Sequence, residues 1–333
     1  MKKLINDPRN YVPEMLEGLV SAYPSLVLGG ESGRCISRST PARSGKVGIA
    51  TGGGSGHLPL FTGYVGDGLL DACAIGNVFE GPSVQSCVDA IRAADHGAGV
   101  LCLFGNYGGD RMNFEMAAEM VELDEIVTET VLGADDVASA PPEEAEKRRG
   151  VAGIVLLYKV AGAAAEEGRS LADVAEVTRK AAAQTRSIGV ALSPCRVPTA
   201  SKPNFELGDS EMEMGMGIHG EPGIWRAPVA SADEVADDML DRLLAELQPP
   251  PGSRLVALVN GLGATPLEEL FILYRRVAAR LAERDMQIIA PLVGNYVTSM
   301  EMAGASLSLM VLDEELERLI RAPACCPFWQ VSP

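Results

Sequence analysis

Hydrophobic residues along the chain fall into two patterns that alternate with each other. Short continuous apolar runs are typical of buried strands, and longer segments with apolar residues every three or four positions are typical of helices. The segment Leu267–Arg284 is of the second kind, with Leu270, Leu273, Val277 and Leu281 on one helical face. Strands that alternate with helices in this way predict an α/β fold.

The two patterns locate the expected elements. The apolar runs predict strands at Gly45–Thr51, Gly97–Phe104, Gly153–Tyr158, Ile188–Leu192, Arg254–Val259, Gln287–Val293 and Ser306–Leu312. The periodic segments predict helices at Val12–Ala22, Ser83–Ala94, Asn113–Leu123, Leu171–Thr185, Ala232–Glu246, Leu267–Arg284 and Asp313–Arg321. Ser231 precedes one of these helices and Glu234 follows it by three residues, which predicts a capping box. Asp135–Arg149 is first acidic, then basic, and contains prolines, so we expect a surface excursion there.

The length of the chain, 333 residues, indicates two domains rather than one. Ser193–Asn204 contains three prolines and has no periodicity, and it follows a predicted strand. We therefore expect an N-terminal α/β domain over residues 1–192 and a C-terminal α/β domain over residues 193–333. Each would have a central sheet flanked by helices.

Charge and cysteine usage narrow the class of protein. The net charge of −17 argues against nucleic acid or an anionic membrane as a partner, because both would repel the chain. No apolar run reaches the ~20 residues that span a bilayer. The first residues contain two lysines but no hydrophobic stretch, so we expect no signal peptide. Seven cysteines without metal-ligand spacing predict reduced thiols in a cytoplasmic protein.

Three glycine-rich segments carry the candidate chemistry, and one of them is Met214–Gly223, which contains His219. Glycine permits backbone conformations closed to other residues and lets a small ligand approach the main chain. A histidine in such a loop offers a nucleophile, a base or a metal ligand near neutral pH. The alternative is a solvated turn in which the histidine has no chemical role.

The second segment, Thr51–His57, directly follows a predicted strand and contains four glycines. Backbone N–H groups of such a loop can point into one concavity, which suits an anion or a polyol. The segment lacks the Gly-Lys-Ser/Thr ending of a phosphate-binding Walker A loop, and it does not match the dinucleotide-binding fingerprint. It ends in His57, which places an imidazole at the end of a strand.

The third segment, Phe104–Glu115, follows another predicted strand and contains Asp110. One interpretation is that Asp110 caps the following helix. The other is that its carboxylate projects from the carboxyl edge of a parallel sheet, where α/β folds bind their ligands. The remaining histidine, His96, stands where a helix ends at a glycine, and we interpret it as a structural residue that bonds the last helix carbonyls.

His57, Asp110 and His219 together form a candidate site of two imidazoles and a carboxylate. We expect no metal there, because zinc needs three or four convergent ligands and the sequence has no matching spacing. The sequence also lacks the Gly-x-Ser-x-Gly elbow of ordinary ester hydrolysis. The residues alone therefore predict a polar small-molecule site in an enzyme.

Seven ordered motifs resemble the substrate-binding K subunit of dihydroxyacetone kinases, and the resemblance extends from about Ile5 to Phe328. The motifs are Gly52–His57, Asn106–Glu115, Arg148–Gly153, Gly189–Cys195, Gly215–Gly223, Leu262–Leu267 and Gly294–Ser299. The resemblance implies two α/β domains, a homodimer, and a phosphotransferase that acts on an alcohol group of a short ketose.

The resemblance also implies a role for each candidate residue. The ketose would be held as a covalent hemiaminal on the imidazole of His219, which distinguishes a ketone from glycerol. Asp110 would be the acid–base residue and His57 its partner. Substrate contacts fall on Gly54, Ser55, Gly56 and His57, with Gly105 at the edge of the site.

The matched motifs do not account for the binding of a nucleotide. In the family, ATP or ADP with Mg²⁺ belongs to a separate L subunit or to a second domain fused after the K domain. Because the sequence ends at Pro333, we expect no cofactor in this chain. We expect instead a separate L subunit, or a phosphotransferase-system component that supplies the phosphoryl group.

Two departures from the family pattern leave the substrate open. Members specific for dihydroxyacetone usually have lysine where this chain has Gly105, and glutamate where it has Leu58. The loss of a charged donor makes a longer ketose such as erythrulose an alternative substrate. A further alternative is a non-catalytic homologue that senses a ketose and presents it to a regulator.

Overall fold

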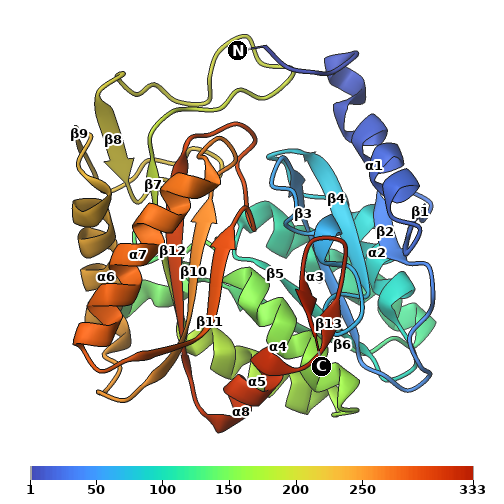
Figure 1. The fold of residues 1–333 in the computed structure, drawn as a ribbon. Coiled ribbons are helices and arrows are strands. Elements are labelled where there is room, and N and C mark those ends of the chain that lie inside the picture. The colour runs from blue at the N-terminus through green and yellow to red at the C-terminus, as the bar shows by residue number, and fades with distance from the viewer. Residues whose placement is uncertain (1, 333) are drawn as a thin grey trace. The chain divides into compact units, whose positions relative to one another are not determined.

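Two α/β units, each with a mixed sheet flanked by helices, make up the computed structural model, which describes residues 2–332 (Figure 1). Unit 1 contains the described residues up to Leu132, Val155–Lys180, and the described residues from Arg318 onward. Unit 2 contains Gly133–Ile154 and Ala181–Glu317. The α/β prediction is confirmed. The chain passes from one unit to the other after Leu132, Ile154, Lys180 and Glu317. The expected domain boundary between residues 192 and 193 stays a prediction.

The helices and strands have the following bounds. The α-helices are α1 Tyr11–Ala22, α2 Val84–Ala94, α3 Gly108–Val121, α4 Ile154–Glu166, α5 Leu171–Ala183, α6 Ala232–Leu247, α7 Leu267–Glu283 and α8 Glu314–Arg321. The strands are β1 Leu26–Gly29, β2 Cys35–Arg38, β3 Gly48–Ser55, β4 Ala72–Val78, β5 Val100–Gly105, β6 Thr128–Gly133, β7 Thr185–Ala191, β8 Glu211–Met214, β9 Trp225–Pro228, β10 Arg254–Gly261, β11 Gln287–Gly294, β12 Gly304–Leu312, β13 Ala324–Cys325 and β14 Gln330–Val331.

The sheet of unit 1 has the strand order β1-β2-β4-β3-β5-β6. Strand β3 lies between β4 and β5 and runs parallel to both. The chain leaves β3 for the neighbour on one side, β4, and then reaches the neighbour on the other side, β5. Strand β3 is therefore a topological switch point, the place where open α/β sheets bind ligands beyond the carboxyl ends of their strands.

Helices α2 and α3 pack on one face of this sheet. Ala50 of β3 and Phe104 of β5 belong to a core shared with Ile91 of α2 and Phe114 of α3. The rings of Phe104 and Phe114 stack with their centroids 4.3 Å apart. On the opposite face Thr51, the residue after Ala50, hydrogen-bonds to Tyr158 of α4 at 2.9 Å. Alternate residues of β3 thus pack on opposite faces, as a strand covered on both sides requires.

The sheet of unit 2 has the order β11-β10-β12-β7-β8-β9, in which β10 and β11 are parallel and the other described pairings are antiparallel. Helices α6 and α7 pack side by side over one face of this sheet (Figure 1). Their apolar faces, which include Leu243 and Val277, are buried in one core with Ala257 and Leu307 of the sheet. Ser231 and Glu234 form the predicted capping box at the start of α6, which is confirmed.

Of two predictions for residues 135–158, one is wrong and the other is confirmed in part. Gly153–Tyr158 is not a strand, because it leads into α4, a buried helix in which most positions are apolar. A helix buried on all sides has no polar face, so its first residues match the pattern of a buried strand. The expected surface excursion Asp135–Arg149 is exposed at its centre, over residues 141–144, but Asp135, Asp136 and Arg148 near its ends are buried.

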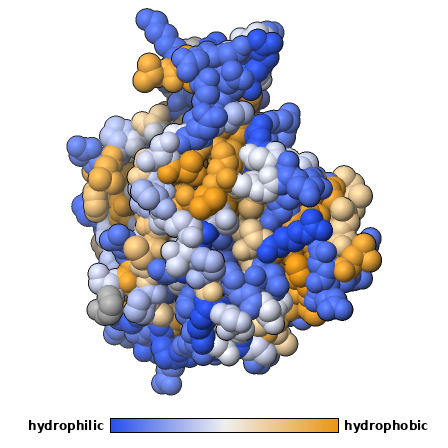
Figure 2. Space-filling view, turned by 90° about the vertical axis from the view of Figure 1, so that its right-hand side faces the viewer, coloured by the Kyte–Doolittle hydropathy of each residue, from blue (hydrophilic) through white to orange (hydrophobic). Residues whose placement is uncertain are grey.

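Polar residues cover most of the face seen in Figure 2, where apolar side chains gather in separate patches. Among the described residues, none of the helices combines the length and the apolar character that a membrane span requires.

Candidate active-site loops

The carboxyl ends of β3, β4 and β5 bring three loops to one edge of the unit 1 sheet. The loop after β3 carries His57, the loop after β4 contains Phe79–Gly81, and the loop after β5 leads into α3 and Asp110. The three strands are parallel neighbours, so their following loops lie at the same edge. Two of the three predicted catalytic residues therefore belong to one sheet edge.

His57 is buried, with 1% of its surface exposed, and its ring stacks on Phe79. The ring centroids are 5.0 Å apart and the planes differ by 23°. Gly54, near the end of β3, lies so close to the loop after β4 that a Cβ atom there would be 2.9 Å from the backbone nitrogen of Glu80. Ser55 is buried and its carbonyl accepts the N–H of Phe79 at 3.0 Å. The glycine-rich loop thus packs directly on the loop that follows β4.

Asp110 is the third residue of α3 and not its cap, since the cap position is Tyr107 and no side chain bonds there. Asp110 is buried, with 8% of its surface exposed. It lies against Gly81, where an added Cβ would contact Oδ1 of Asp110. Asn113 donates a hydrogen bond to the carbonyl of Pro82 at 2.7 Å and ties α3 to the same loop. His57 and Asp110 therefore both lie against residues 79–82, and the first helical turn favours the negative charge.

Gly105, the other predicted residue at this edge, is the last residue of β5 and is buried. Its carbonyl accepts the N–H of Tyr107 at 2.8 Å. The remaining histidine, His96, does not bond the helix end as expected. It follows α2 by two residues, and its Nε2 is 3.4 Å from Oδ1 of the buried Asp71.

His219 belongs to unit 2 and lies in the loop between β8 and β9. Gly215 and Gly220 have φ of 81° and 89°, in the left-handed region where glycine is favoured. The loop is held on both sides of the histidine. Ser299 donates a hydrogen bond to the carbonyl of Ile218, and Asn204 donates one to the carbonyl of His219 at 2.9 Å.

The ring of His219 is paired with a carboxylate that the sequence analysis did not single out. Nδ1 of His219 is 2.8 Å from Oε1 of Glu221, and the backbone N–H of His219 donates to Oε2 at 3.0 Å. The His219 side chain is 22% exposed and that of Glu221 30%. Glu221 stands two residues after His219 in a glycine-rich loop, and this spacing was the available signal in the sequence.

Arg149, which the sequence analysis named only within the motif Arg148–Gly153, lies next to this pair. Arg149 donates to Oδ2 of Asp136 at 2.9 Å and to the carbonyl of Gly215 at 3.1 Å. Its Nη1 lies 4.0 Å from Oε2 of Glu221. The sequence separation between Arg149 and Glu221 gives no local signal for this arrangement.

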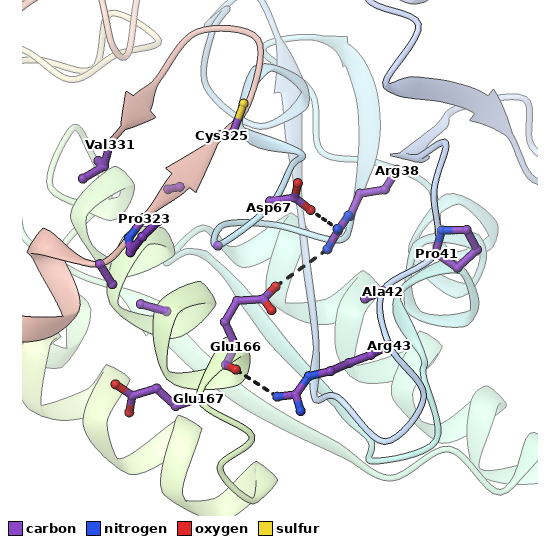
Figure 3. Close-up of a pocket in the computed structure, with 14 residues that line it drawn as sticks. Arg38, Pro41, Ala42, Arg43, Asp67, Glu166, Glu167, Pro323, Cys325 and Val331 are labelled. Carbon is purple, nitrogen blue, oxygen red and sulfur yellow. Dashed lines mark hydrogen bonds and ion pairs between the residues drawn. The ribbon is translucent and has the colours of Figure 1, made fainter. Parts of the chain in front are cut away.

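A cavity of about 800 Å³ in unit 1 contains none of the predicted site residues (Figure 3). Two arginines that line the cavity, Arg38 and Arg43, are bonded to neighbouring residues of unit 1. Arg38 pairs with Asp67 and with Asp71, and Arg43 donates to the carbonyl of Glu166 at 2.9 Å. Because both arginines are already bonded within unit 1, we interpret them as structural residues and do not assign the catalytic site to this cavity. In residues 2–332 we find no group of three or more side chains that could hold a metal ion.

A family model described as the Dak1 domain matches residues 17–328. The chain is 46% identical over 331 residues to an L-erythrulose kinase of Pectobacterium atrosepticum, covering 98% of this chain and 56% of that protein. It is 45% identical over 333 residues to the "PTS-dependent dihydroxyacetone kinase 2, dihydroxyacetone-binding subunit DhaK" of Listeria innocua, covering both proteins fully. The chain thus spans about half the length of one of these relatives and the whole of the other.

Solved structures of related proteins are also similar to this chain over nearly its whole length. The dihydroxyacetone kinase of C. freundii has a TM-score of 0.90 and 34% identity, covering 99% of this chain and 60% of that one. A dihydroxyacetone kinase operon co-activator, Dha-DhaQ, has a TM-score of 0.88 and 32% identity, covering 95% of this chain and 97% of that one. Both a kinase and a regulator are therefore similar to this chain along nearly its whole length.

Proposed function

Because the chain belongs to the Dak1 family, we propose that it is the ketose-binding subunit of a kinase that phosphorylates dihydroxyacetone or a similar short ketose. The observation that carries this proposal is the imidazole of His219. The ring is partly exposed on a glycine-rich turn that is fixed by hydrogen bonds from Asn204 and Ser299. A reactive ring on a turn of this kind is open to a small ligand and keeps its orientation.

His219 would bind the ketose covalently. Its Nε2 attacks the carbonyl carbon, the π pair of the C=O bond moves to oxygen, and that oxygen takes up a proton. The ring gives up its Nδ1 proton, so the ketose adds to the protein without loss of water. Glycerol has no carbonyl and cannot form this hemiaminal, which gives the site its selectivity.

Asp110 would accept the proton of the ketose hydroxyl as that oxygen attacks the phosphoryl group, and His57 would assist it. The position of both residues against the loop of residues 79–82 supports a shared task. Gly54, Ser55 and Gly56 would supply the backbone contacts to the substrate hydroxyls.

We place ATP or ADP and Mg²⁺ on a separate L subunit, which would take its phosphoryl group from ATP or from a phosphotransferase-system component. The Listeria innocua relative, which is matched over its full length and is named a dihydroxyacetone-binding subunit, supports this division. We further propose a homodimer in the cytoplasm. The seven free thiols agree with a reducing compartment.

The proposal is tested by reconstitution with the L subunit of a related dihydroxyacetone kinase and a measurement of ketose phosphate. Asp110→Asn should lower kcat by about 10²–10⁴-fold, the usual contribution of a general base. Glu119→Gln, on the exposed side of the same helix, is the matched control and should leave kcat unchanged. Turnover of Asp110→Asn at the parent rate would show that Asp110 is not the base.

A second candidate function is a ketose sensor that presents its ligand to a regulator. The similarity to the operon co-activator over 97% of that chain favours it. The same reconstitution separates the two functions. A protein that binds the ketose yet yields no ketose phosphate with any active L subunit is a sensor.

A further inference from the structure

Glu221 holds both the backbone and the ring of His219. One carboxylate oxygen, Oε2, accepts the backbone N–H of His219 at 3.0 Å, and the other, Oε1, is 2.8 Å from ring Nδ1. Two bonds from one carboxylate to one residue fix the ring relative to the main chain. The two residues are separated only by Gly220, whose φ of 89° lets the loop fold back in this way.

Glu221 is ionised at neutral pH. Burial raises the pKa of this carboxyl, but the hydrogen bond and charge of His219, with a smaller effect from Arg149, together lower the pKa to about 2. An ionised carboxylate can only accept hydrogen bonds. The Nδ1 atom that faces it must therefore carry the proton, and in a neutral ring the lone pair is then on Nε2.

Arg149 secures the carboxylate from behind. Its Nη1 is 4.0 Å from Oε2 of Glu221, while Nη2 donates to the carbonyl of Gly215 at the start of the same loop. An added Cβ at Gly217 would lie 2.6 Å from Nη1 of Arg149, so this glycine leaves room for the guanidinium. The arginine thus connects the first residue of the loop with the carboxylate that follows the histidine.

Two other carboxylates near the loop, Asp136 and Glu213, are paired with arginines. Asp136 accepts from Arg149, and although burial raises the pKa of Asp136 to about 6, it is ionised above that pH. Glu213 of β8 accepts from Arg226 of β9 at 2.6 Å and from the backbone of Gly223 at 2.7 Å. Glu221, in contrast, is bonded to the ring of His219.

We propose that Glu221 is a positioning residue that holds His219 as the Nδ1–H tautomer and thereby presents Nε2 to the ketose carbonyl. This inference rests on the proposed function. The carboxylate also stabilises the positive charge that develops on the ring as Nε2 attacks, because it is already in place before the reaction begins.

The experiment is ¹⁵N NMR of the histidine rings in the ligand-free protein, recorded at alkaline pH. The parent should show the Nδ1–H tautomer. In Glu221→Gln the new amide can donate to Nδ1, so the Nε2–H tautomer should appear. Glu213→Gln, in the same hairpin, should keep the parent tautomer. An Nε2–H tautomer in the parent, or an unchanged tautomer in Glu221→Gln, would overturn the proposal.

Ketose binding to the same three proteins separates this proposal from the proposed function. Adduct formation in Glu221→Gln should weaken by about 10- to 100-fold, the factor expected for loss of one hydrogen bond to a charged group. Adduct formation in Glu213→Gln should stay near the parent value. If the tautomers behave as expected and the parent forms no adduct at all, the proposed function fails while the role of Glu221 in orienting the ring stands.

Discussion

Arg148 donates two parallel hydrogen bonds to the carboxylate of Glu246, at 2.6 and 2.7 Å, from a side chain with no exposed surface. Its Nε also donates to the carbonyl of Ala140 at 2.9 Å. The pair fastens the segment before α4 to the end of α6 within unit 2. A guanidinium in this position depends on its carboxylate, because an uncompensated buried charge is costly.

Glu246→Gln should therefore destabilise the protein by about 3–5 kcal/mol, the usual result of breaking a buried ion pair. The free energy of unfolding in urea measures the effect. Glu283→Gln, at the exposed end of α7, is the control and should change stability by less than about 0.5 kcal/mol. A Glu246→Gln variant as stable as the control would show that Arg148 finds another partner.

Gly76 tests the packing that supports His57. A Cβ at this position of β4 would overlap the backbone oxygen of Glu80, which belongs to the loop on which His57 stacks. Gly76→Ala should cost about 1–3 kcal/mol of stability, because the backbone must move. Gly18→Ala in α1, where nothing lies within 4 Å, should instead stabilise the protein by about 0.5–1 kcal/mol. Equal unfolding midpoints for the two variants would contradict the close packing at Gly76.

The sequence predicts those parts of the fold whose pattern is local. The apolar run of β10 and the periodic face of α7 each carry enough signal to locate the element. The beginning of α4 does not, since a helix buried on all sides and a buried strand share the same apolar pattern until their lengths differ. The composition of Ser193–Asn204 does not delimit these units, because the chain passes between them at the end of β6 and inside α4, α5 and α8, which have no loop composition.

In the candidate site, too, features set by neighbouring residues in the sequence can be predicted, and contacts between distant segments cannot. The placement of His57 and Asp110 at one sheet edge follows from parallel strands, which the βαβ pattern predicts. The ring of Phe79 under His57 does not follow, because it depends on a loop that only the folded sheet brings near. The sequence also allows Asp110 to be a helix cap. Its place in the first turn depends on where α3 begins, which the sequence does not locate. Whether these residues act in catalysis stays a prediction.

We expect the stability of the protein to depend on pH in the alkaline range because of Lys159. Its side chain is fully buried in α4, where Nζ donates to the carbonyl of Leu319 at 2.7 Å, and burial lowers its pKa to about 8 from 10.5. Between these two values the unfolded chain binds more protons than the folded one, so the stability contributed by this position rises with pH. The stability contributed by Lys159 is present in full above pH 10.5 and is lost as the pH falls through 8.

Comparison with Lys159→Met isolates this contribution. From pH 8 to pH 9.5 the stability of the parent should increase relative to the variant, by at most about 1.4 kcal/mol per pH unit. Urea unfolding at several pH values measures the difference. Parallel stability curves for the two proteins would contradict a lowered pKa at Lys159.

Gly105 is the position at which substrate length can be altered. Lysine there would add a charged donor at the end of β5, worth about 1.5–3 kcal/mol in a bond to a triose. We expect the parent to use erythrulose at least as efficiently as dihydroxyacetone, and Gly105→Lys to shift kcat/KM toward dihydroxyacetone. Competition between the two ketoses in the reconstituted kinase measures the preference. Gly109→Ala, which adds a methyl group into open space nearby, should leave it unchanged. The same preference in Gly105→Lys and the parent would contradict a role for this position in selecting substrate length.

Covalent capture of a ketose by His219 is tested most directly by intact-protein mass spectrometry under native conditions. With dihydroxyacetone the parent should gain the full mass of the ketose, because the addition releases no water, and with glycerol it should gain nothing. His219→Gln should show no gain with either compound. A parent that gains no mass, or a His219→Gln variant that gains as much as the parent, would contradict covalent binding at His219.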